Sequence, residues 1–439
     1  MKTDLLLLLA LLLWIVVGTS WLRWPPFRVL LLATLFGALG FRIPFADIPI
    51  VIGLGFGNTA KKIGVLILIG SWIGVCLEAS GATLSIARAL LQKLAQWPLH
   101  FVVGFIGYWV SIPVFCDAAF VILNSLNDQL ARESNTPKIG LTVALSTGLF
   151  ATHVLVPPTP GPLAAAANFQ LNNLFLLFVW GAFLALILTL AGAAYSYWIG
   201  NKAKEPISLA DSQPAAMTEK PLPGITAALM PIMLPIILMA LGTLPTRNPL
   251  LKEIISTLSN PSVALFAGGL LGLPLLIRYT ETSLWQQLQK SEQQALPIIL
   301  ITAMGGALGK VLQQLPLGDY LAALPFTKSL GLLVPFLLAA LIKTAQGSST
   351  VAILTASAIA FPLLPALGMD SEIGKVWGIL AIGTGAMTVS HANDSYFWIV
   401  SQVGGIEPKK ALRTHTLATL LQGILGILLL LASYQLIGK

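Results

Sequence analysis

The stretch THVLVPPTPGP, Thr152 to Pro162, decides the fold, because its four prolines interrupt a long run without charge. Residues 139–201 contain no Asp, Glu, Lys or Arg, which leaves room for two membrane crossings of about 20 residues each. Proline lacks an N–H group and clashes with the preceding turn, so this stretch stops any helix. A broken backbone at membrane depth is tolerated only under a cover of protein or in a water-filled cavity. The prediction is a re-entrant tip or a discontinuous helix, with an ordinary loop between two helices as the alternative.

The composition places the whole chain in a membrane. Of its 439 residues, 56% are hydrophobic and 10% are charged, and the mean hydropathy is +0.85, whereas soluble proteins carry about 25% charged residues. About twelve hydrophobic segments follow one another, and none alternates in polarity as a strand of a transmembrane barrel does. Because backbone polar groups in lipid need internal partners, we predict an all-α, polytopic protein. We expect residues 1–20 to form a retained first helix rather than a cleaved signal peptide.

Charge and motifs exclude several classes of function. The formal charge of +8 is scattered among the hydrophobic segments, so the basic residues are interpreted as loop anchors and lipid contacts rather than a nucleic-acid surface. Cys76 and Cys116 lie in apolar runs and are predicted to fill the core. The four histidines lack metal-ligand spacing and no P-loop is present, so we expect no metal, no cofactor and no direct use of ATP.

Two halves of the chain contain similar landmarks in the same order, separated by a polar linker at residues 201–223. The matching landmarks are Gly70–Glu78 with Gly305–Gln313, Asp117–Val121 with Ser349–Ile353, and His153 with His391. Transporters built by such duplication mostly contain inverted repeats, which is the expectation here. The predicted parts are N-terminal helices with a connecting loop (1–61), repeat one (62–199), the linker with connecting helices (200–296) and repeat two (297–436).

Within VSHANDSYFW, Val389 to Trp398, the six residues 390–395 place an imidazole, an amide, a carboxylate and two hydroxyls between apolar segments. A charged side chain at membrane depth costs at least about 2.5 kcal/mol, so it faces a partner, a cavity or a pathway. The alternative is a hydrogen-bonded cluster that joins helices or lies at the membrane edge. The matching position in the first half, around His153, is also polar, which favours a functional site.

Residues 343–350, KTAQGSST, form a third polar stretch. Small hydroxyl residues beside glycine can be packing contacts between helices. They can also open a helix, so that the N–H groups of a half-helix, with about half a positive charge, face a carboxylate. Lys343 would add a full positive charge there or extend to the interface.

Three further stretches are weaker signals. Asp117 follows a long uncharged run and is a candidate proton carrier. Gly55–Lys62, GFGNTAKK, is expected to be an interfacial loop. Gly70–Gly81 is as typical of close helix packing as of a site.

These motifs together resemble those of the gluconate permease family, a group of bacterial symporters for gluconate, related sugar acids, glycerate and D-serine. The similar stretches are GFGNT (55–59), GSWIGVCLEASGA (70–82), H-x-x-x-P-P-x-P-G-P (153–162), AQGSSTVA (345–352) and SHANDSYFW (390–398). The resemblance runs from about residue 50 to near the C-terminus. It implies inverted repeats with hairpins and broken helices, and an elevator-like exchange between a scaffold and a moving part. Cys116-Asp117, Thr159 and Lys343 depart from the family's usual Phe-Glu, His and Arg.

The expected function is secondary active uptake of a small hydroxy-carboxylate with protons across a bacterial inner membrane, by alternating access. Ser348, Ser349, Thr350 and Lys343 would bind the carboxylate, and His153, Asn393, Asp394 and Ser395 would contact hydroxyl or amino groups. Asp117, His391 or Asp394 would carry the proton, since histidine titrates near neutral pH.

Other functions and partners stay open at this point. A sodium-coupled dicarboxylate carrier is the main alternative, because GNT and GSST resemble small polar loops that hold sodium. A channel or an intramembrane enzyme is further away, and we expect no enzyme activity. The expected partners are the organic anion and the lipid bilayer, and a homo-oligomer is compatible with the sequence.

Overall fold

The computed structural model describes residues 2–22, 24–202, 221–245, 248–314 and 331–437, and within these ranges every regular element is a helix. Six helical segments in this part are long and apolar enough to cross a membrane, and six shorter apolar helices accompany them. The prediction of an all-α, polytopic protein is therefore confirmed. The predicted polar linker falls mainly on residues 203–220, outside the described ranges.

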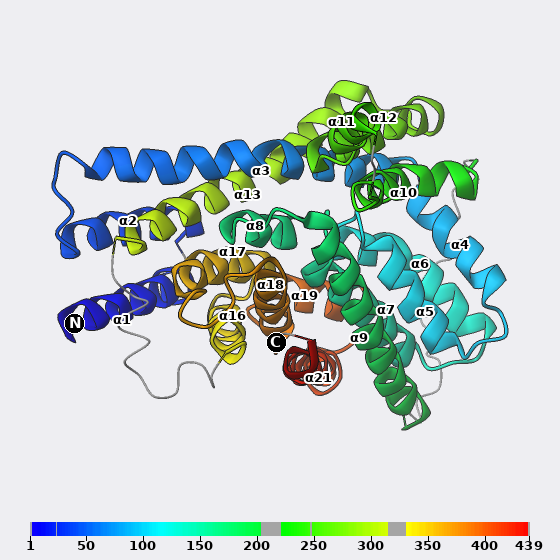
Figure 1. The fold of residues 1–439 in the computed structure, drawn as a ribbon. Coiled ribbons are helices and arrows are strands. Elements are labelled where there is room, and N and C mark those ends of the chain that lie inside the picture. The colour runs from blue at the N-terminus through cyan, green and yellow to red at the C-terminus, as the bar shows by residue number, and fades with distance from the viewer. Residues whose placement is uncertain (1, 23, 203–220, 246–247, 315–330, 438–439) are drawn as a thin grey trace.

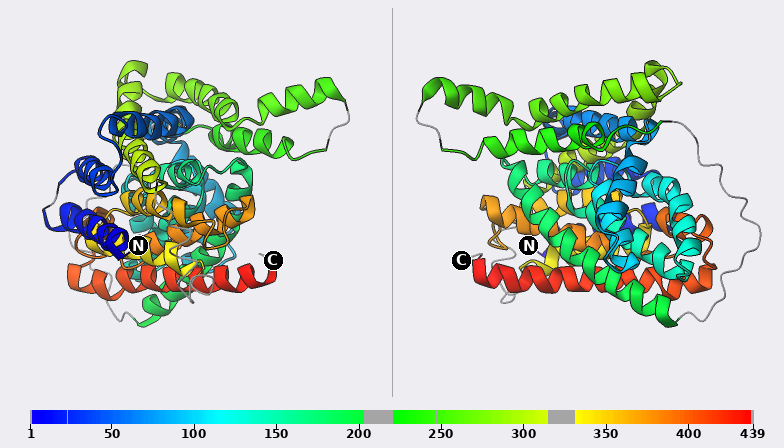
Figure 2. Two further views of the ribbon diagram at one scale, coloured as in Figure 1. Left: turned by 60° about the vertical axis from the view of Figure 1, so that its left-hand side comes forward. Right: turned by 90° about the vertical axis from the view of Figure 1, so that its right-hand side faces the viewer.

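One group of helices, called the frame below, forms the upper and left-hand part of Figure 1. It consists of α1 (Lys2–Val16), α2 (Pro26–Gly40), α3 (Ile48–Ala79), α10 (Ile225–Leu241), α11 (Pro249–Leu258), α12 (Pro261–Tyr279) and α13 (Leu284–Leu312). The long helices α3 and α13 pack against each other along much of their length. Figure 2 shows α10, α11 and α12 projecting from one end of the molecule.

The expected loop at Gly55–Lys62 is wrong, because these residues lie inside α3. Gly55 in this stretch allows two helices to pack closely and does not form a turn. A Cβ atom on Gly55 would lie 2.7 Å from Cα of Ala307, so only glycine lets α3 approach α13 this closely. On the other helix, a Cβ atom on Gly306 would meet Oγ1 of Thr59 at 2.0 Å. The backbones therefore cross at a contact of small residues, which close packing of helices in lipid requires.

The second group, called the inner group, contains the polar stretches. Its members are α5 (Leu99–Val110), α6 (Cys116–Glu133), α7 (Lys138–Leu155), α8 (Pro160–Asn168), α9 (Leu174–Lys202), α16 (Leu333–Gln346), α17 (Ser349–Ala360), α18 (Glu372–Met387), α19 (Ser395–Gln402) and α21 (His415–Ile437). α7 is buried along its whole length from Gly140 onward. A helix enclosed on every side by protein can contain a histidine and several hydroxyls, since neighbouring helices supply their partners.

Four breaks divide the inner group into half-length helices. They lie at residues 111–115, 156–159, 347–348 and 388–394. The break at 156–159 is the proline stretch, and it is buried, as a discontinuous helix requires and an exposed loop does not. The order of half-helices from α5 to α8 recurs from α16 to α19. The exact repeat boundaries and the inversion of the repeats remain predictions.

Gly70 and Gly74 of α3 allow the breaks at residues 111–115 and 156–159 to pack against this helix. A Cβ atom on Gly70 would lie 3.0 Å from the carbonyl oxygen of Pro158, and one on Gly74 would lie 2.6 Å from that of Pro113. Both breaks therefore rest directly on α3. Close packing, and not ligand binding, accounts for these two glycines.

Candidate functional site

The starts of three half-helices meet at one cavity of about 300 Å³. These are the first turns of α6, α17 and α19, and His153 at the end of α7 joins them. The lining residues are Phe115, Cys116, Asp117, His153, Pro297, Ile298, Ile301, Ser348, Ser349, Thr350, Val351, Leu354, Asp394, Ser395 and Tyr396. The cavity is thus lined by residues from three of the four breaks, and the proline stretch does not line it.

Helix starts place partial positive charge at this cavity. The first N–H groups of a helix have no partner within the helix, and the helix dipole places about half a positive charge at that end. In α17 the Ser348 side chain accepts a hydrogen bond from the Val351 N–H, 3.3 Å away, which leaves the N–H groups of Ser349 and Thr350 without a cap. Phe115 provides no side-chain cap for α6. Such groups form a ready carboxylate site.

Gly347 produces the bend before α17. Its φ is +94°, a conformation that side chains disfavour, and it ends α16 at Gln346. The Gln346 side chain accepts a hydrogen bond from the Ser348 N–H at 3.3 Å. A Cβ atom on Gly347 would lie 2.1 Å from the carbonyl oxygen of Asn393, so the two breaks of the second half touch at this glycine. The sequence prediction of an opened helix at KTAQGSST agrees with this geometry.

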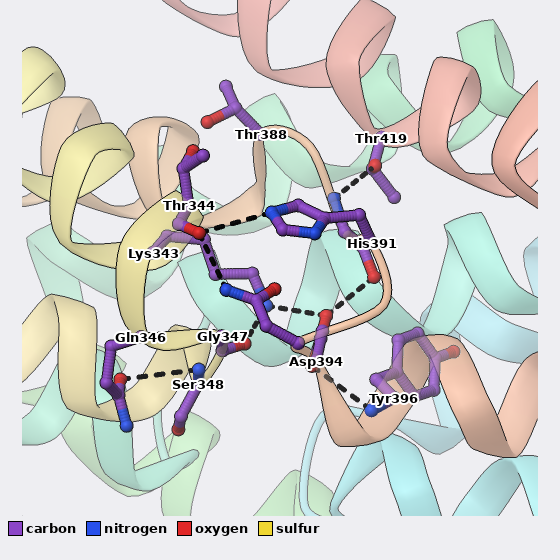
Figure 3. A network of polar contacts seen from close by, with 12 residues as sticks. Lys343, Thr344, Gln346, Gly347, Ser348, Thr388, His391, Asp394, Tyr396 and Thr419 are labelled. Carbon is purple, nitrogen blue, oxygen red and sulfur yellow. Dashed lines mark hydrogen bonds and ion pairs between the residues drawn. The ribbon is translucent and has the colours of Figure 1, made fainter. Parts of the chain in front are cut away.

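Lys343 and Asp394 form a buried ion pair that joins the two breaks (Figure 3). The Nζ–Oδ2 distance is 2.6 Å, and the side chains are 1% and 3% exposed. Lys343 also donates to the carbonyl of Gly347, and Asp394 caps α19 by accepting from the Tyr396 N–H at 3.1 Å. The carboxylate of Asp394 receives a third hydrogen bond from the Ser390 hydroxyl at 2.6 Å. A buried pair with this many partners fixes the geometry at the starts of α17 and α19.

His391 and Asn393 lie in the loop before α19, and their side chains contact the end of α16. The Asn393 Nδ2 donates to the carbonyl oxygen of Thr344 at 2.6 Å, and the Nε2 of His391 lies 3.1 Å from the same oxygen (Figure 3). Neither residue lines the cavity. In this conformation both tie residues 389–394 to the end of α16.

His415 was missed by the sequence reasoning, although it is fully buried beside the site. Its two ring nitrogens each lie 3.1 Å from a serine oxygen, Ser390 on one side and Ser146 on the other. Hydrogen bonds thus run from Asp394 through Ser390 and His415 to α7. The sequence feature that could have indicated His415 is its position at the start of the uncharged run 414–438. Because His415 is separated in sequence from the other polar clusters, the sequence does not show its contacts with Ser390 and Ser146.

Two polar groups in the cavity have no strong partner. The Nδ1 of His153 is buried without a hydrogen bond in the described part of the protein. Asp117 has only the weak Cys116 thiol donor, with Sγ 3.6 Å from Oδ1, and it forms no ion pair with any described residue. His153 is buried and Asp117 is half-buried, and polar groups removed from water without a partner are costly, so both groups suit a ligand or a proton.

Most of the predicted site residues are therefore brought together. Those that line the cavity are Asp117, His153, Ser348, Ser349, Thr350, Asp394 and Ser395. Lys343 lies behind it, bound to Asp394, while Asn393 and His391 lie outside it. Their roles toward a ligand remain predictions.

Replacing Ser390 by Ala is expected to lower the free energy of unfolding by about 1–3 kcal/mol, because Asp394 and His415 each lose a buried hydrogen-bond partner. Denaturation by SDS in mixed micelles measures this change. Ser196→Ala is the matched control, since that buried hydroxyl donates only to the Ala193 carbonyl, at 2.7 Å. Equal losses for the two variants would contradict the role assigned to Ser390.

A cavity at the starts of broken helices, among membrane-spanning segments, is typical of secondary transporters. The family comparison assigns the chain more closely: residues 3–437 match the model of the GntP family permeases, and the chain belongs to that family. It is thus a transporter and not an enzyme, and a multi-pass protein of the bacterial inner membrane.

Individual relatives agree with this assignment. The D-serine transporter DsdX of Escherichia coli K12 is 28% identical over 415 residues, covering 92% of each chain. The gluconate permease of Pseudomonas aeruginosa is 28% identical over 420 residues, again covering 92% of each. The crystal structure of the Alcanivorax borkumensis YdaH transporter superposes with a TM-score of 0.64 over 89% of both chains at 16% identity, which is a similarity of fold.

Proposed function

We propose that the protein takes up a small hydroxy-carboxylate together with protons. The observation that supports this most is the meeting of three helix starts at a cavity that also contains Asp117, a carboxylate without an ion pair among the described residues. Helix N-termini bind carboxylates, and Asp117 is a half-buried carboxylate without a cation, which favours proton uptake. The named relatives transport D-serine and gluconate, which both carry a carboxylate and a hydroxyl group.

In the proposed complex, the substrate carboxylate accepts hydrogen bonds from the N–H groups of Ser349 and Thr350 and from the Ser348 and Ser349 hydroxyls. His153 and Ser395 face the remaining hydroxyl or amino groups. Lys343 acts through Asp394, whose position it fixes. Asn393 reaches the substrate only if its loop moves, because its amide bonds Thr344 in this conformation.

Asp117 is the proposed proton carrier. Asp394 already has a cation and two further hydrogen-bond donors, so its charge is satisfied, whereas Asp117 has only the weak Cys116 thiol donor. A proton on Asp117 would remove the repulsion between its carboxylate and that of the arriving anion. His391 lies outside the cavity and would join the proton path only in another conformation.

The cavity walls favour movement of the inner group relative to the frame. Every polar lining residue comes from the inner group, while the frame contributes the apolar residues Pro297, Ile298 and Ile301 of α13. A substrate that is bound by polar residues of the inner group, and that contacts only apolar residues of the frame, can move together with the inner group. This asymmetry is what an elevator-like exchange requires.

Uptake into proteoliposomes tests the function. We expect saturable accumulation of D-gluconate, D-glycerate or D-serine that increases when the outside is made more acidic at constant sodium. Uptake that needs sodium when pH is equal on both sides would instead support the sodium-coupled dicarboxylate carrier. Saturable uptake without any response to pH would remove the proton-coupling claim.

Asp117→Asn is expected to abolish accumulation driven by a pH gradient, since an amide cannot carry the proton, while exchange of labelled for unlabelled substrate continues. Comparing the two assays on one preparation measures the difference. Asp128→Asn is the control, because that carboxylate lies farther along the same helix and pairs with Lys138 at 2.7 Å. Accumulation retained in Asp117→Asn would show that another group carries the proton.

A further inference from the structure

A second cavity, called the outer cavity below, lies at the opposite end of α17 from the cavity described above, which is called the inner cavity. The outer cavity is the larger of the two. Its volume is about 410 Å³, and it is lined by α3, α8, α13, α17 and α18. Ala358 and Phe361 border it, whereas Val351 and Leu354 border the first cavity. Ala358 lies seven positions after Val351 in the helix, which corresponds to about 10 Å along the axis. The two cavities share no lining residue.

Three lysines from three helices line this outer cavity: Lys62 of α3, Lys310 of α13 and Lys375 of α18. Within the described part of the chain, Lys62 and Lys310 form no ion pair. Lys375 donates to the Gln170 carbonyl at 3.2 Å and lies 3.5 Å from the Glu372 carboxylate. That carboxylate also accepts hydrogen bonds from the N–H groups of Asn172 and Asn173, just before α9. Excess positive charge therefore faces the cavity, and such a site attracts anions.

The cavity also contains groups that bind hydroxyls. Asn58 and Thr59 line it beside Lys62, so the GFGNTAKK stretch, which serves no part of the inner cavity, belongs here. Asn168 is 6% exposed, and its Nδ2 donates to the Leu354 carbonyl at 3.2 Å and the Ser357 hydroxyl at 2.8 Å. Its Oδ1 is buried and has no hydrogen-bond partner among the residues that the structure describes. A buried acceptor without a donor is rare in proteins and fits a ligand hydroxyl.

We propose that the outer cavity is a second anion site, which binds a hydroxylated carboxylate before it reaches the inner cavity. Ammonium groups of Lys62 and Lys310 hold the carboxylate, and Asn58, Thr59 and Asn168 hold hydroxyls. Asn168 bonds the carbonyl of Leu354, a residue of the inner cavity wall. The outer site thus adjoins the wall that the ligand must pass. This inference rests on the proposed function for the identity of the ligand.

Lysine protection tests the site without measuring transport. The full chain in phosphatidylcholine nanodiscs is treated with formaldehyde and a borane reductant, and methylation of each lysine is read by peptide mass spectrometry. We expect D-gluconate to slow methylation of Lys62 and Lys310 about fivefold or more, as occupied cationic sites become inaccessible. The neutral polyol sorbitol is expected to have no effect. Lys61 is an internal control, because it lies on the same helix, is exposed and does not line the cavity.

The outcomes separate the possible sources of the anion. Protection that persists in a Ser349→Ala background supports an outer site independent of the inner one. Protection that appears only when phosphatidylglycerol is added, and does not respond to gluconate, would assign the site to a lipid headgroup and overturn the proposal. Absence of protection under every condition would overturn it as well. Loss of pH-driven uptake with protection intact would remove the proposed function and leave this site standing.

Kinetics of a double variant supply a second measurement. Lys62→Gln with Lys310→Gln is expected to raise the KM for uptake about tenfold, with a smaller change in Vmax, because electrostatic attraction raises the local anion concentration. The dependence of KM on ionic strength should weaken in parallel. Lys61→Gln, the control, should leave both parameters unchanged. A KM equal to that of the wild type in the double variant would contradict capture at these lysines.

Discussion

Lys343→Met is expected to lower the free energy of unfolding by about 3–5 kcal/mol and to abolish substrate binding, because it leaves the Asp394 carboxylate buried without its cation. The ion pair joins the ends of α16 and α19 at 2.6 Å, and both side chains are at most 3% exposed. Its loss also removes the hydrogen bond from Lys343 to the Gly347 carbonyl. Titration with SDS in mixed micelles measures stability, and equilibrium dialysis with labelled D-gluconate measures binding.

Two comparisons make this result specific. Adding Asp394→Asn to Lys343→Met should recover part of the lost stability, since the buried charge disappears with its partner. Lys290→Met is the matched control: Lys290 pairs with Glu78 at 2.8 Å but is 43% exposed, so its loss should cost below about 1 kcal/mol. Similar losses for Lys343→Met and Lys290→Met would contradict the structural role of the buried pair.

Gly347→Ala is the second change with a large expected effect. The methyl group would lie 2.1 Å from the Asn393 carbonyl oxygen, and the φ of +94° is strained for alanine. We expect a loss of about 1–3 kcal/mol from backbone strain alone. Because relief of the clash must displace the loop before α19 or the start of α17, uptake should fall below detection. Stability and proteoliposome uptake of the same preparation give the two values.

Gly57→Ala provides the control for a glycine without contacts. No atom lies within 4 Å of the position that its Cβ would take, and the residue is inside α3. Alanine should therefore stabilise the helix by up to about 1 kcal/mol and leave uptake intact. Normal uptake by Gly347→Ala would show that the two breaks need not touch for the site to work.

The sequence predicted the breaks better than it predicted their partners. Prolines after His153, the glycine at Gly347 and the polar cluster around Asp394 each stand out against apolar surroundings, and each lies at a break in the structure. Lys343 was expected beside the substrate carboxylate, and in this conformation it lies against Asp394. Spacing along one chain identifies polar stretches, but it does not show which of them meet.

Two residues illustrate the limit of such reasoning. His415 lies close to Ser390 only because α21 crosses beside the loop before α19, a contact that no periodicity predicts. Lys62 was assigned to an interfacial loop, because glycines near it are typical of turns. Its helix α3 is continuous and packs at Gly55 against α13, which lies more than two hundred residues away in sequence.

Direct observation of the ligand tests the central claim most directly. A cryo-electron microscopy map of the protein in nanodiscs with D-gluconate should show the carboxylate about 3 Å from the N–H groups of Ser349 and Thr350, at the start of α17. Asp117 and His153 should face the same ligand across the cavity. Gluconate density elsewhere in the protein, with this cavity empty at saturating ligand, would contradict binding by converging helix starts.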